Sequence, residues 1–276
     1  MLKYPGFNPI AVEFGPFHLL GRELGPIEVH WYGIMYLVGF AAGWWLARFR
    51  ASRPGSTWKA ADVDDFVFFA MLGVILGGRI GYVLFYGLPF WKGDPWYPFK
   101  VWEGGMSFHG GMLGVAAALL IFAVRRGRRF ADVLDFAAPL PGIGLFAGRI
   151  GNFINGELWG KATTLPWGFQ VDGVVRHPSQ LYEAGLEGIV LFIALWLYTV
   201  KPRPRLAPTG LFLVIYGVSR FLVEFVRVPD PQIGYLAGGW VTMGQVLSLP
   251  MILGGAALIL IAYRRGVSSG NWAAAR

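Results

Sequence analysis

Arginines that stand between glycines are the residues of this sequence best suited to chemistry. The clearest case is Arg149, within residues 148–160, where an apolar stretch gives way to Asn152, Asn155 and Glu157. A guanidinium keeps its charge at any accessible pH, so burying one in or beside a hydrocarbon layer is costly unless an anion or water meets it. The pattern therefore predicts a site for a negatively charged group, with amide donors beside it.

The composition indicates a membrane protein. Of the 276 residues, 55% are hydrophobic and 14% are charged, which is more apolar surface than one soluble core needs. Seven segments are long and apolar enough to span a bilayer as helices, at residues 30–47, 66–86, 107–124, 134–151, 181–200, 209–226 and 240–263. The N-terminus lacks the features of a cleaved signal peptide. We expect residues 1–276 to form a single, all-α polytopic membrane domain.

Basic residues give the orientation. They cluster after the first, third, fifth and seventh segments, as Arg48, Arg50, Arg53 and Lys59, then Arg125, Arg126, Arg128 and Arg129, then Lys201, Arg203 and Arg205, then Arg264 and Arg265. The positive-inside rule then predicts an external N-terminus and a cytoplasmic C-terminus. The net charge of +8 anchors the protein at the membrane, and we expect no nucleic acid as a partner.

With this orientation, polar residues far apart in sequence fall into one layer near the outer leaflet. They are Tyr32, Arg79, His109, Arg149, Arg220 and Glu224. The cytoplasmic halves of the same segments carry almost no charge. The asymmetry predicts a site that opens toward the outer leaflet.

Structural roles for these residues remain alternatives. Arg220 and Glu224 are four apart on one helix face and could simply neutralise each other. Arg79 and Arg149 have no such neighbour on their own helices. His109 could be a helix-start residue bonded to a carbonyl.

The tetrapeptide Gly-Arg-Ile-Gly occurs twice, at residues 78–81 and 148–151, on two segments predicted to run in the same direction. The repetition could record an internal duplication, although four residues do not establish one. Spaced glycines such as Gly73, Gly77 and Gly81 favour close helix packing over ligand contact.

Two outer loops are expected to be structured. Residues 86–106 combine tryptophan, tyrosine and phenylalanine with Lys92 and Lys100, which is typical of an arm lying in the lipid interface. Residues 155–179 contain two short β-prone runs around Asp172 and Gly173, which predicts a β-hairpin within a small extracytoplasmic head.

At these residues the chain resembles the bacterial prolipoprotein diacylglyceryl transferase family. The signature is residues 148–160, supported by residues 30–33, 78–82, 107–111, 177–183, 219–221 and 224–230. The resemblance covers almost the whole chain. It implies a seven-helix enzyme of the bacterial inner membrane that moves diacylglycerol from phosphatidylglycerol to the lipobox cysteine of a lipoprotein precursor. A thioether forms and glycerol phosphate leaves, as the first step of lipoprotein maturation.

The residues fit that chemistry. Phosphatidylglycerol carries one phosphate anion at the depth predicted for the arginines, and guanidinium binds phosphate through paired hydrogen bonds. Positioned cations would also stabilise the charge that develops on leaving glycerol phosphate. The chain has no cysteine, so the nucleophilic sulfur must come from the partner.

The resemblance also implies roles for individual residues. Arg149 and Arg220 would bind the phosphate, with Arg227 and Arg79 as further candidates, and His109 would be the general base for the thiol. The arginines could instead activate the thiol unaided. Tyr32, Asn152 and Asn155 would orient the head group, Glu157 and Glu224 would fix the arginines, and Gly160 would permit close backbone approach. Glu183 and Gln180 are expected to support the head instead of the reaction.

Two other classes of protein also place arginines within membranes. A transporter or lipid flippase needs polar groups reachable from both sides, whereas the inner halves here are apolar. A binding or scaffold protein could use the arginines as a paired structural core. We expect no metal and no cofactor, because the four histidines lack ligand spacing and there is no nucleotide-binding loop.

Overall fold

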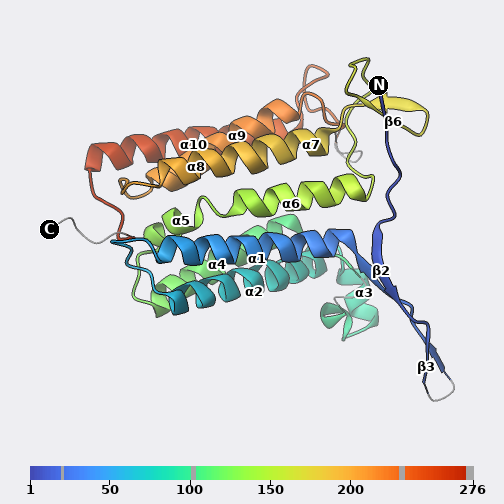
Figure 1. Ribbon diagram of the computed structural model, residues 1–276, viewed down its shortest axis with the longest axis horizontal. Coiled ribbons are helices and arrows are strands. Elements are labelled where there is room, and N and C mark those ends of the chain that lie inside the picture. The colour runs from blue at the N-terminus through green and yellow to red at the C-terminus, as the bar shows by residue number, and fades with distance from the viewer. Residues whose placement is uncertain (20–21, 101–103, 230–233, 272–276) are drawn as a thin grey trace. The chain divides into compact units, whose positions relative to one another are not determined.

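The structure is a computed structural model that describes residues 1–19, 22–100, 104–229 and 234–271. It is mostly helical (Figure 1) and forms two compact units. The first unit contains Met1–Gly43 and Ala138–Val267, and the second contains Trp44–Ala137 and Ser268–Arg276. Helix α1 (Trp31–Ala51) begins in the first unit and ends in the second.

All seven predicted segments contain helix. Besides α1, the helices are α2 (Ala60–Phe85), α4 (Phe108–Arg125), α5 (Phe130–Ala137), α6 (Pro141–Ile154), α7 (Ser179–Glu183), α8 (Leu191–Tyr198), α9 (Ala207–Val223) and α10 (Met243–Arg265). Within the described residues, Ala60–Phe85, Ser179–Tyr198 and Met243–Arg265 are each long and apolar enough to cross a membrane. Helices α5 and α6 qualify together as one broken span. Length and composition thus give three to four candidate spans, as in a membrane protein.

Helix α2 begins at Ala60, before the predicted start at residue 66, and its first turn is charged. Lys59 precedes the helix, and its backbone N–H donates to the Asp62 carboxylate at 3.1 Å. An acidic group in the first turn also interacts favourably with the helix dipole. Hydropathy detects only the apolar part of such a helix, so the prediction missed the polar start.

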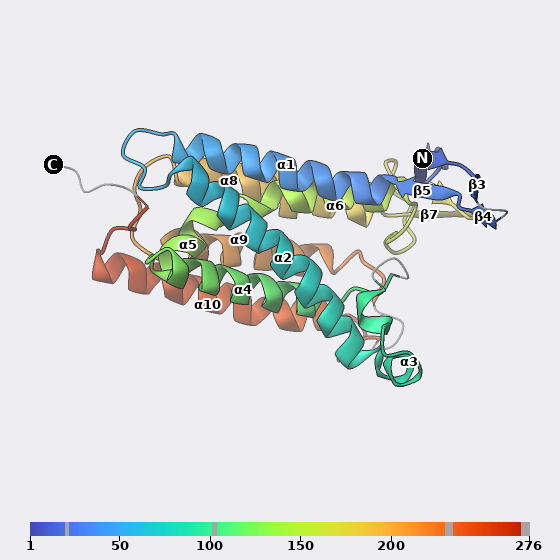
Figure 2. The ribbon, with the colours of Figure 1, turned by 90° about the horizontal axis from the view of Figure 1, so that it is seen from below.

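In the first unit, α9 and α10 lie side by side, and α6 packs against the segment that follows α7 (Figures 1 and 2). Small residues allow the close approach: a Cβ added to Gly210 would lie 2.7 Å from the Gly255 carbonyl oxygen. The segment after α7 is a π-helix, η3 (Ala184–Val190), which continues into α8. π-Turns are rare and are often found at functional sites.

In the second unit, α2 packs closely against α4 (Figure 2). A Cβ on Gly73 would lie 2.7 Å from the Gly114 carbonyl oxygen, so the packing role predicted for this glycine is confirmed. Trp58 and Phe136 stack with ring centroids 3.7 Å apart in a buried aromatic cluster that also includes Phe122. This cluster is the apolar core at one end of the unit.

Short strands form three small sheets. Strands β6 (Phe169–Val171) and β7 (Val174–Arg176) pair antiparallel, and β1 (Leu2–Lys3) adds to β6 in parallel. Asp172 and Gly173 have φ of 49° and 78°, as a primed turn requires, so the hairpin predicted from these residues is present. The sequence interpretation missed two N-terminal ribbons, β2 (Ile10–Phe14) with β5 (Ile27–His30) and β3 (Phe17–Leu19) with β4 (Arg22–Leu24).

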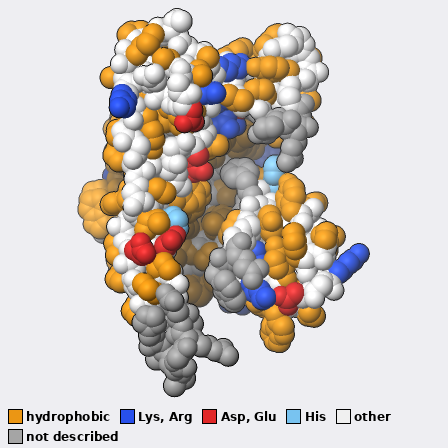
Figure 3. Space-filling view, turned by 90° about the vertical axis from the view of Figure 1, so that its right-hand side faces the viewer, with side chains coloured by type: hydrophobic (Ala, Val, Ile, Leu, Met, Phe, Trp, Pro, Cys, Tyr) orange, Lys and Arg blue, Asp and Glu red, His pale blue; other side chains and the backbone are white. Residues whose placement is uncertain are grey.

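The predicted interfacial arm contains a short helix, α3 (Leu88–Gly93), and a 3₁₀ turn, η1 (Tyr97–Phe99). Residues 101–103 of the arm lie outside the described part of the chain. Its aromatic side chains Phe90, Trp96 and Phe99 are exposed, and hydrophobic side chains cover much of the arm at the lower right of Figure 3. Exposed aromatic residues beside lysines suit a lipid interface.

Candidate functional site

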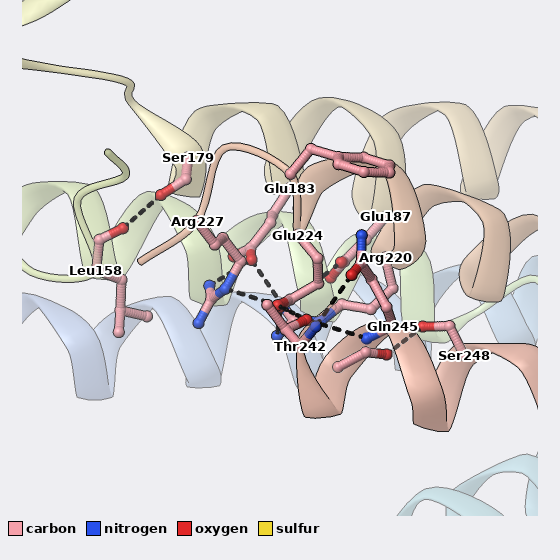
Figure 4. Close-up of polar contacts among 12 residues, drawn as sticks. Leu158, Ser179, Glu183, Glu187, Arg220, Glu224, Arg227, Thr242, Gln245 and Ser248 are labelled. Carbon is pink, nitrogen blue, oxygen red and sulfur yellow. Dashed lines mark hydrogen bonds and ion pairs between the residues drawn. The ribbon is translucent and has the colours of Figure 1, made fainter. Parts of the chain in front are cut away.

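A buried carboxylate, Glu183, joins three arginines in the first unit. Its Oε2 atom lies 2.8 Å from Arg149 Nε, and its Oε1 atom lies 2.8 Å from Arg220 Nη1 and 2.5 Å from Arg227 Nη1. Figure 4 shows this carboxylate among the polar contacts that link α7 to α9. Residues distant in the sequence therefore form one ionic cluster, the arginine cluster.

Two more carboxylates complete the arginine cluster. Glu224 Oε1 lies 2.5 Å from Arg220 Nη2 and 3.1 Å from Arg227 Nε, and the Thr242 hydroxyl donates to Glu224 Oε2 at 2.6 Å. Glu187 Oε2 lies 3.5 Å from Arg149 Nη2, and Glu187 Oε1 lies 3.9 Å from Arg220 Nη1. Glu224 thus contacts two arginines and a hydroxyl group.

Most members of the cluster lie in helical segments. Arg149 is on α6, Arg220 is on α9, and Arg227 lies in the turn after α9. Glu183 ends α7, and Glu187 lies in the π-helix η3. Thr242 caps α10 by accepting a hydrogen bond from the Gln245 backbone N–H at 3.2 Å. Four helical segments thus fix the positions of the charges.

The carboxylates are more deeply buried than the arginines. The side chains of Glu183 and Glu187 are 0% exposed, whereas those of Arg149, Arg220 and Arg227 keep exposures of 21%, 20% and 14%. The arginine side chains are therefore held by buried carboxylates and are themselves partly exposed. A guanidinium fixed in this way can still offer N–H donors to an incoming anion.

As the sequence indicates, helix α6 itself offers Arg149 no charged neighbour. Glu183 and Glu187 instead reach Arg149 from the neighbouring helix. The Arg220–Glu224 pairing considered as an alternative is present, but it is one part of a larger cluster. The negative groups that compensate these arginines are thus carboxylates of the protein.

An amide network borders Arg149. Asn152 Oδ1 accepts from Arg149 Nη1 at 3.4 Å, while Asn152 Nδ2 donates to Glu157 Oε1 at 2.7 Å. Asn155 Nδ2 also donates to Glu157 Oε1, at 3.4 Å. Glu157 therefore orients the two amides, whereas the sequence had assigned it to an arginine. Asn155 Oδ1 is buried and has no hydrogen-bond partner among the described residues.

Tyr32 lies beside the same part of α6. A Cβ on Gly151 would come within 3.0 Å of the Tyr32 ring, so glycine at this position lets the ring pack against the helix. The hydroxyls of Tyr32 and Tyr36 lie 3.1 Å apart. The structure thus brings Tyr32, Arg149 and Asn152 into one region, as the sequence predicted.

Gly160 permits close approach between backbone segments of the protein. Its N–H donates to the His177 carbonyl at 2.8 Å, and an added Cβ would lie 2.5 Å from the Val226 carbonyl oxygen.

Burial, with Lys161 as a weaker influence, lowers the pKa of His177 below its usual value. His177 is therefore neutral at pH 7 and adds no charge here.

Arg79 has a different environment, in the second unit. Its side chain donates to the backbone oxygens of Tyr97, Pro98, Lys100, Gly104 and Gly105, at 2.5 to 3.3 Å. A guanidinium has five N–H donors, so these bonds use all of them. Arg79 is also buried, at 4% exposure. Its contacts hold the arm and leave no donor for a phosphate.

His109 is also in the second unit, in the first turn of α4. Ser107 caps this helix by accepting from the Gly110 N–H at 3.2 Å, and the His109 side chain is exposed. The remaining predicted site residues, apart from Arg79, belong to the first unit. The described contacts thus unite the predicted arginine and amide residues of the first unit.

Sequence reasoning missed the central role of Glu183 and the presence of Glu187. Both lie in an apolar helix, and Glu187 falls inside a predicted span. An acidic residue at such a depth needs a positive partner. Matching the intramembrane carboxylates to the intramembrane arginines by charge would have identified the cluster.

Comparison with known proteins identifies the family of the chain. The profile described as prolipoprotein diacylglyceryl transferase matches residues 21–261. The chain belongs to the prolipoprotein diacylglyceryl transferase family. Its apolar helices and this family indicate a multi-pass protein of the bacterial inner membrane.

Members of this transferase family resemble the chain over nearly its full length. The phosphatidylglycerol–prolipoprotein diacylglyceryl transferase of Solidesulfovibrio magneticus is 57% identical over 92% of this chain and 94% of its own length. The Azotobacter vinelandii protein of the same name is 56% identical over 96% of this chain and 98% of its own length. The Pseudomonas putida protein of the same name is 52% identical over 96% of this chain and 97% of its own length. The predicted family resemblance is therefore confirmed.

Proposed function

We propose that this chain transfers the diacylglyceryl group of phosphatidylglycerol to a prolipoprotein, in the first step of bacterial lipoprotein maturation. The names of its relatives support this reaction. The observation that carries the site assignment is the set of guanidiniums that are pinned by fully buried carboxylates yet partly exposed. Such an arrangement suits an anionic head group.

In this proposal, Arg149 and Arg220 bind the phosphate of phosphatidylglycerol. The thiol sulfur of the lipobox cysteine attacks the glyceryl carbon, and a C–S bond forms as the C–O bond to phosphate breaks. The electron pair of that bond remains on phosphate, so the leaving glycerol phosphate gains negative charge. Guanidiniums already in place stabilise this charge without reorganisation. Arg227 shares Glu183 and Glu224 with Arg220 and supports its position.

The thiol must lose its proton before or during attack. We assign His109 as the general base, because it is exposed in the first turn of α4 and an imidazole is the side chain that most often accepts a proton in catalysis. Tyr32, Asn152 and Asn155 orient the head group, with Glu157 holding both amides. Arg79 is assigned to the arm, since carbonyl oxygens use its five donors.

The same proposal includes the topology. Seven helices cross the membrane, with the N-terminus outside and the C-terminus in the cytoplasm, because the basic clusters follow alternate segments. The β6–β7 hairpin then belongs to an extracytoplasmic head, and the arginine cluster faces the outer leaflet. Residues 86–106 lie in the interface. These placements put the site where phosphatidylglycerol and an exported lipobox segment meet.

A reconstituted reaction tests the function. Purified full-length chain is incubated with phosphatidylglycerol and a lipobox peptide, and the peptide is analysed by mass spectrometry. We expect its mass to increase by one diacylglyceryl group, with release of one glycerol phosphate. Replacing the lipobox cysteine with serine should abolish the mass increase. Folded chain that leaves the peptide unmodified, or that only moves lipid between leaflets, would rule the proposal out.

A further inference from the structure

Within the described residues, the arginine cluster contains as many carboxylates as guanidiniums. Arg149, Arg220 and Arg227 are matched by Glu183, Glu187 and Glu224. With all six groups ionised, the net charge of the cluster is zero. A balanced cluster attracts an anion less strongly than the bare arginines would.

The carboxylates differ in how firmly they hold the arginines. Glu183 lies within 2.8 Å of all three guanidiniums, and Glu224 lies 2.5 Å from Arg220. Glu187 lies 3.5 Å from Arg149 Nη2 and 3.9 Å from Arg220 Nη1. Among the residues that the structure describes, Glu183 Oε1 accepts hydrogen bonds from Arg220 and Arg227, whereas Glu183 Oε2 and both Glu187 oxygens have no hydrogen-bond partner. Glu183 and Glu224 thus fix the geometry, whereas Glu187 contributes mainly charge.

Charged and titratable groups face Glu187 from three elements. Arg149 approaches from α6, Glu183 from α7, and Arg220 together with Tyr216 from α9. The Glu187 side chain is 0% exposed, so water does not screen its charge. It interacts with the same two arginines that are assigned to the substrate phosphate. A phosphate bound there would feel its repulsion.

We propose that Glu187 is a positioning residue that weakens the hold of the arginine cluster on phosphate, so that an anionic lipid binds reversibly and glycerol phosphate can leave. The inference rests on the proposed function, in which Arg149 and Arg220 bind phosphate. Glycerol phosphate carries more negative charge than the phosphodiester from which it derives. The repulsion from Glu187 is therefore larger for the product than for the substrate.

Titration calorimetry with glycerol phosphate tests this role, using full-length chain in non-ionic detergent. The variant Glu187→Gln keeps the shape of the side chain and removes its charge. We expect Gln at this position to lower the Kd for glycerol phosphate about tenfold. The KM for phosphatidylglycerol should fall in parallel. A merely structural role would weaken binding, so a gain in affinity is diagnostic.

Glu187→Met provides a second variant of similar volume and should shift the affinity in the same direction, since it also removes the negative charge while Glu183 and Glu224 still hold the arginines. Unchanged or weaker binding in a folded variant of either kind would overturn the role of Glu187. Arg220→Ala separates this failure from failure of the proposed function. Wild-type affinity in Arg220→Ala would refute the phosphate site itself. Lost binding in Arg220→Ala, without a gain in the Glu187 variants, would refute only the role of Glu187.

Discussion

Arg149 and Arg79 stand in the same tetrapeptide, Gly-Arg-Ile-Gly, and have opposite environments. Arg149 contacts the carboxylates Glu183 and Glu187 and keeps a side-chain exposure of 21%. Arg79 donates to five backbone carbonyl oxygens of the arm and is almost completely buried. Identical local sequence therefore does not give identical surroundings, because the partners come from elsewhere in the chain.

The chemistry of the acceptors explains the difference. Carbonyl oxygens carry no formal charge, so Arg79 needs all five donors to offset its burial. The charged carboxylates compensate Arg149 through fewer contacts. Arg149 therefore keeps N–H groups beyond these contacts on a partly exposed side chain, and Arg79 keeps none. This comparison predicts different consequences for substitutions in the two regions.

The largest effect is expected for arginines of the cluster. Arg149→Ala and Arg220→Ala should each lower kcat/KM for phosphatidylglycerol about a thousandfold, the upper range for loss of one preorganised charge donor. The radioactive or mass-based transfer assay measures this directly. Retention of a tenth or more of wild-type kcat/KM in a folded variant would show that the residue does not act on the reacting phosphate.

A smaller effect is expected for the carboxylate that holds the arginines. Glu183→Gln should lower kcat about a hundredfold, because three guanidiniums lose their common anchor, and should destabilise the protein by about 3 kcal/mol. Both quantities are accessible from initial rates and a thermal melt.

Asp132→Asn is the matched control for Glu183→Gln. Asp132 is also a buried carboxylate, but it accepts from the Gly270 backbone N–H at 2.9 Å and from the Ser269 hydroxyl at 3.4 Å. This variant should lower the melting temperature while the folded protein keeps its kcat. Equal losses of kcat in the two variants would mean that Glu183 has only a structural role.

The smallest catalytic effect is expected for Arg79. Arg79→Gln should leave buried carbonyl groups unpaired and cost about 1–3 kcal/mol locally. Limited proteolysis should then cut the arm, near residues 94–100, faster than in the wild type, while kcat changes less than in Arg149→Ala. An activity loss as large as that of Arg149→Ala, with the arm still protected, would remove the contrast between the two arginines.

The sequence predicted most of the helices and the β6–β7 turn. Helices occur at all seven predicted segments because continuous apolar runs have few alternatives, and the Asp172-Gly173 turn has a strong local signal. The partners of the arginines were harder to predict, because they depend on which helices meet. Glu183 was assigned to the head from its place near a helix start, whereas packing against α6 and α9 places it among three guanidiniums. The N-terminal ribbons were missed because attention to spanning segments left the first residues without an assignment.

The most direct test of the central claim measures the distance between arginine and phosphate. Solid-state NMR can detect dipolar coupling between ³¹P of bound phosphatidylglycerol and ¹³C-labelled guanidinium groups in the reconstituted protein. We expect coupling at short range that is reduced in Arg149→Lys and in Arg220→Lys but unchanged in Arg79→Lys. Coupling that survives in Arg149→Lys and Arg220→Lys but disappears in Arg79→Lys would contradict the account.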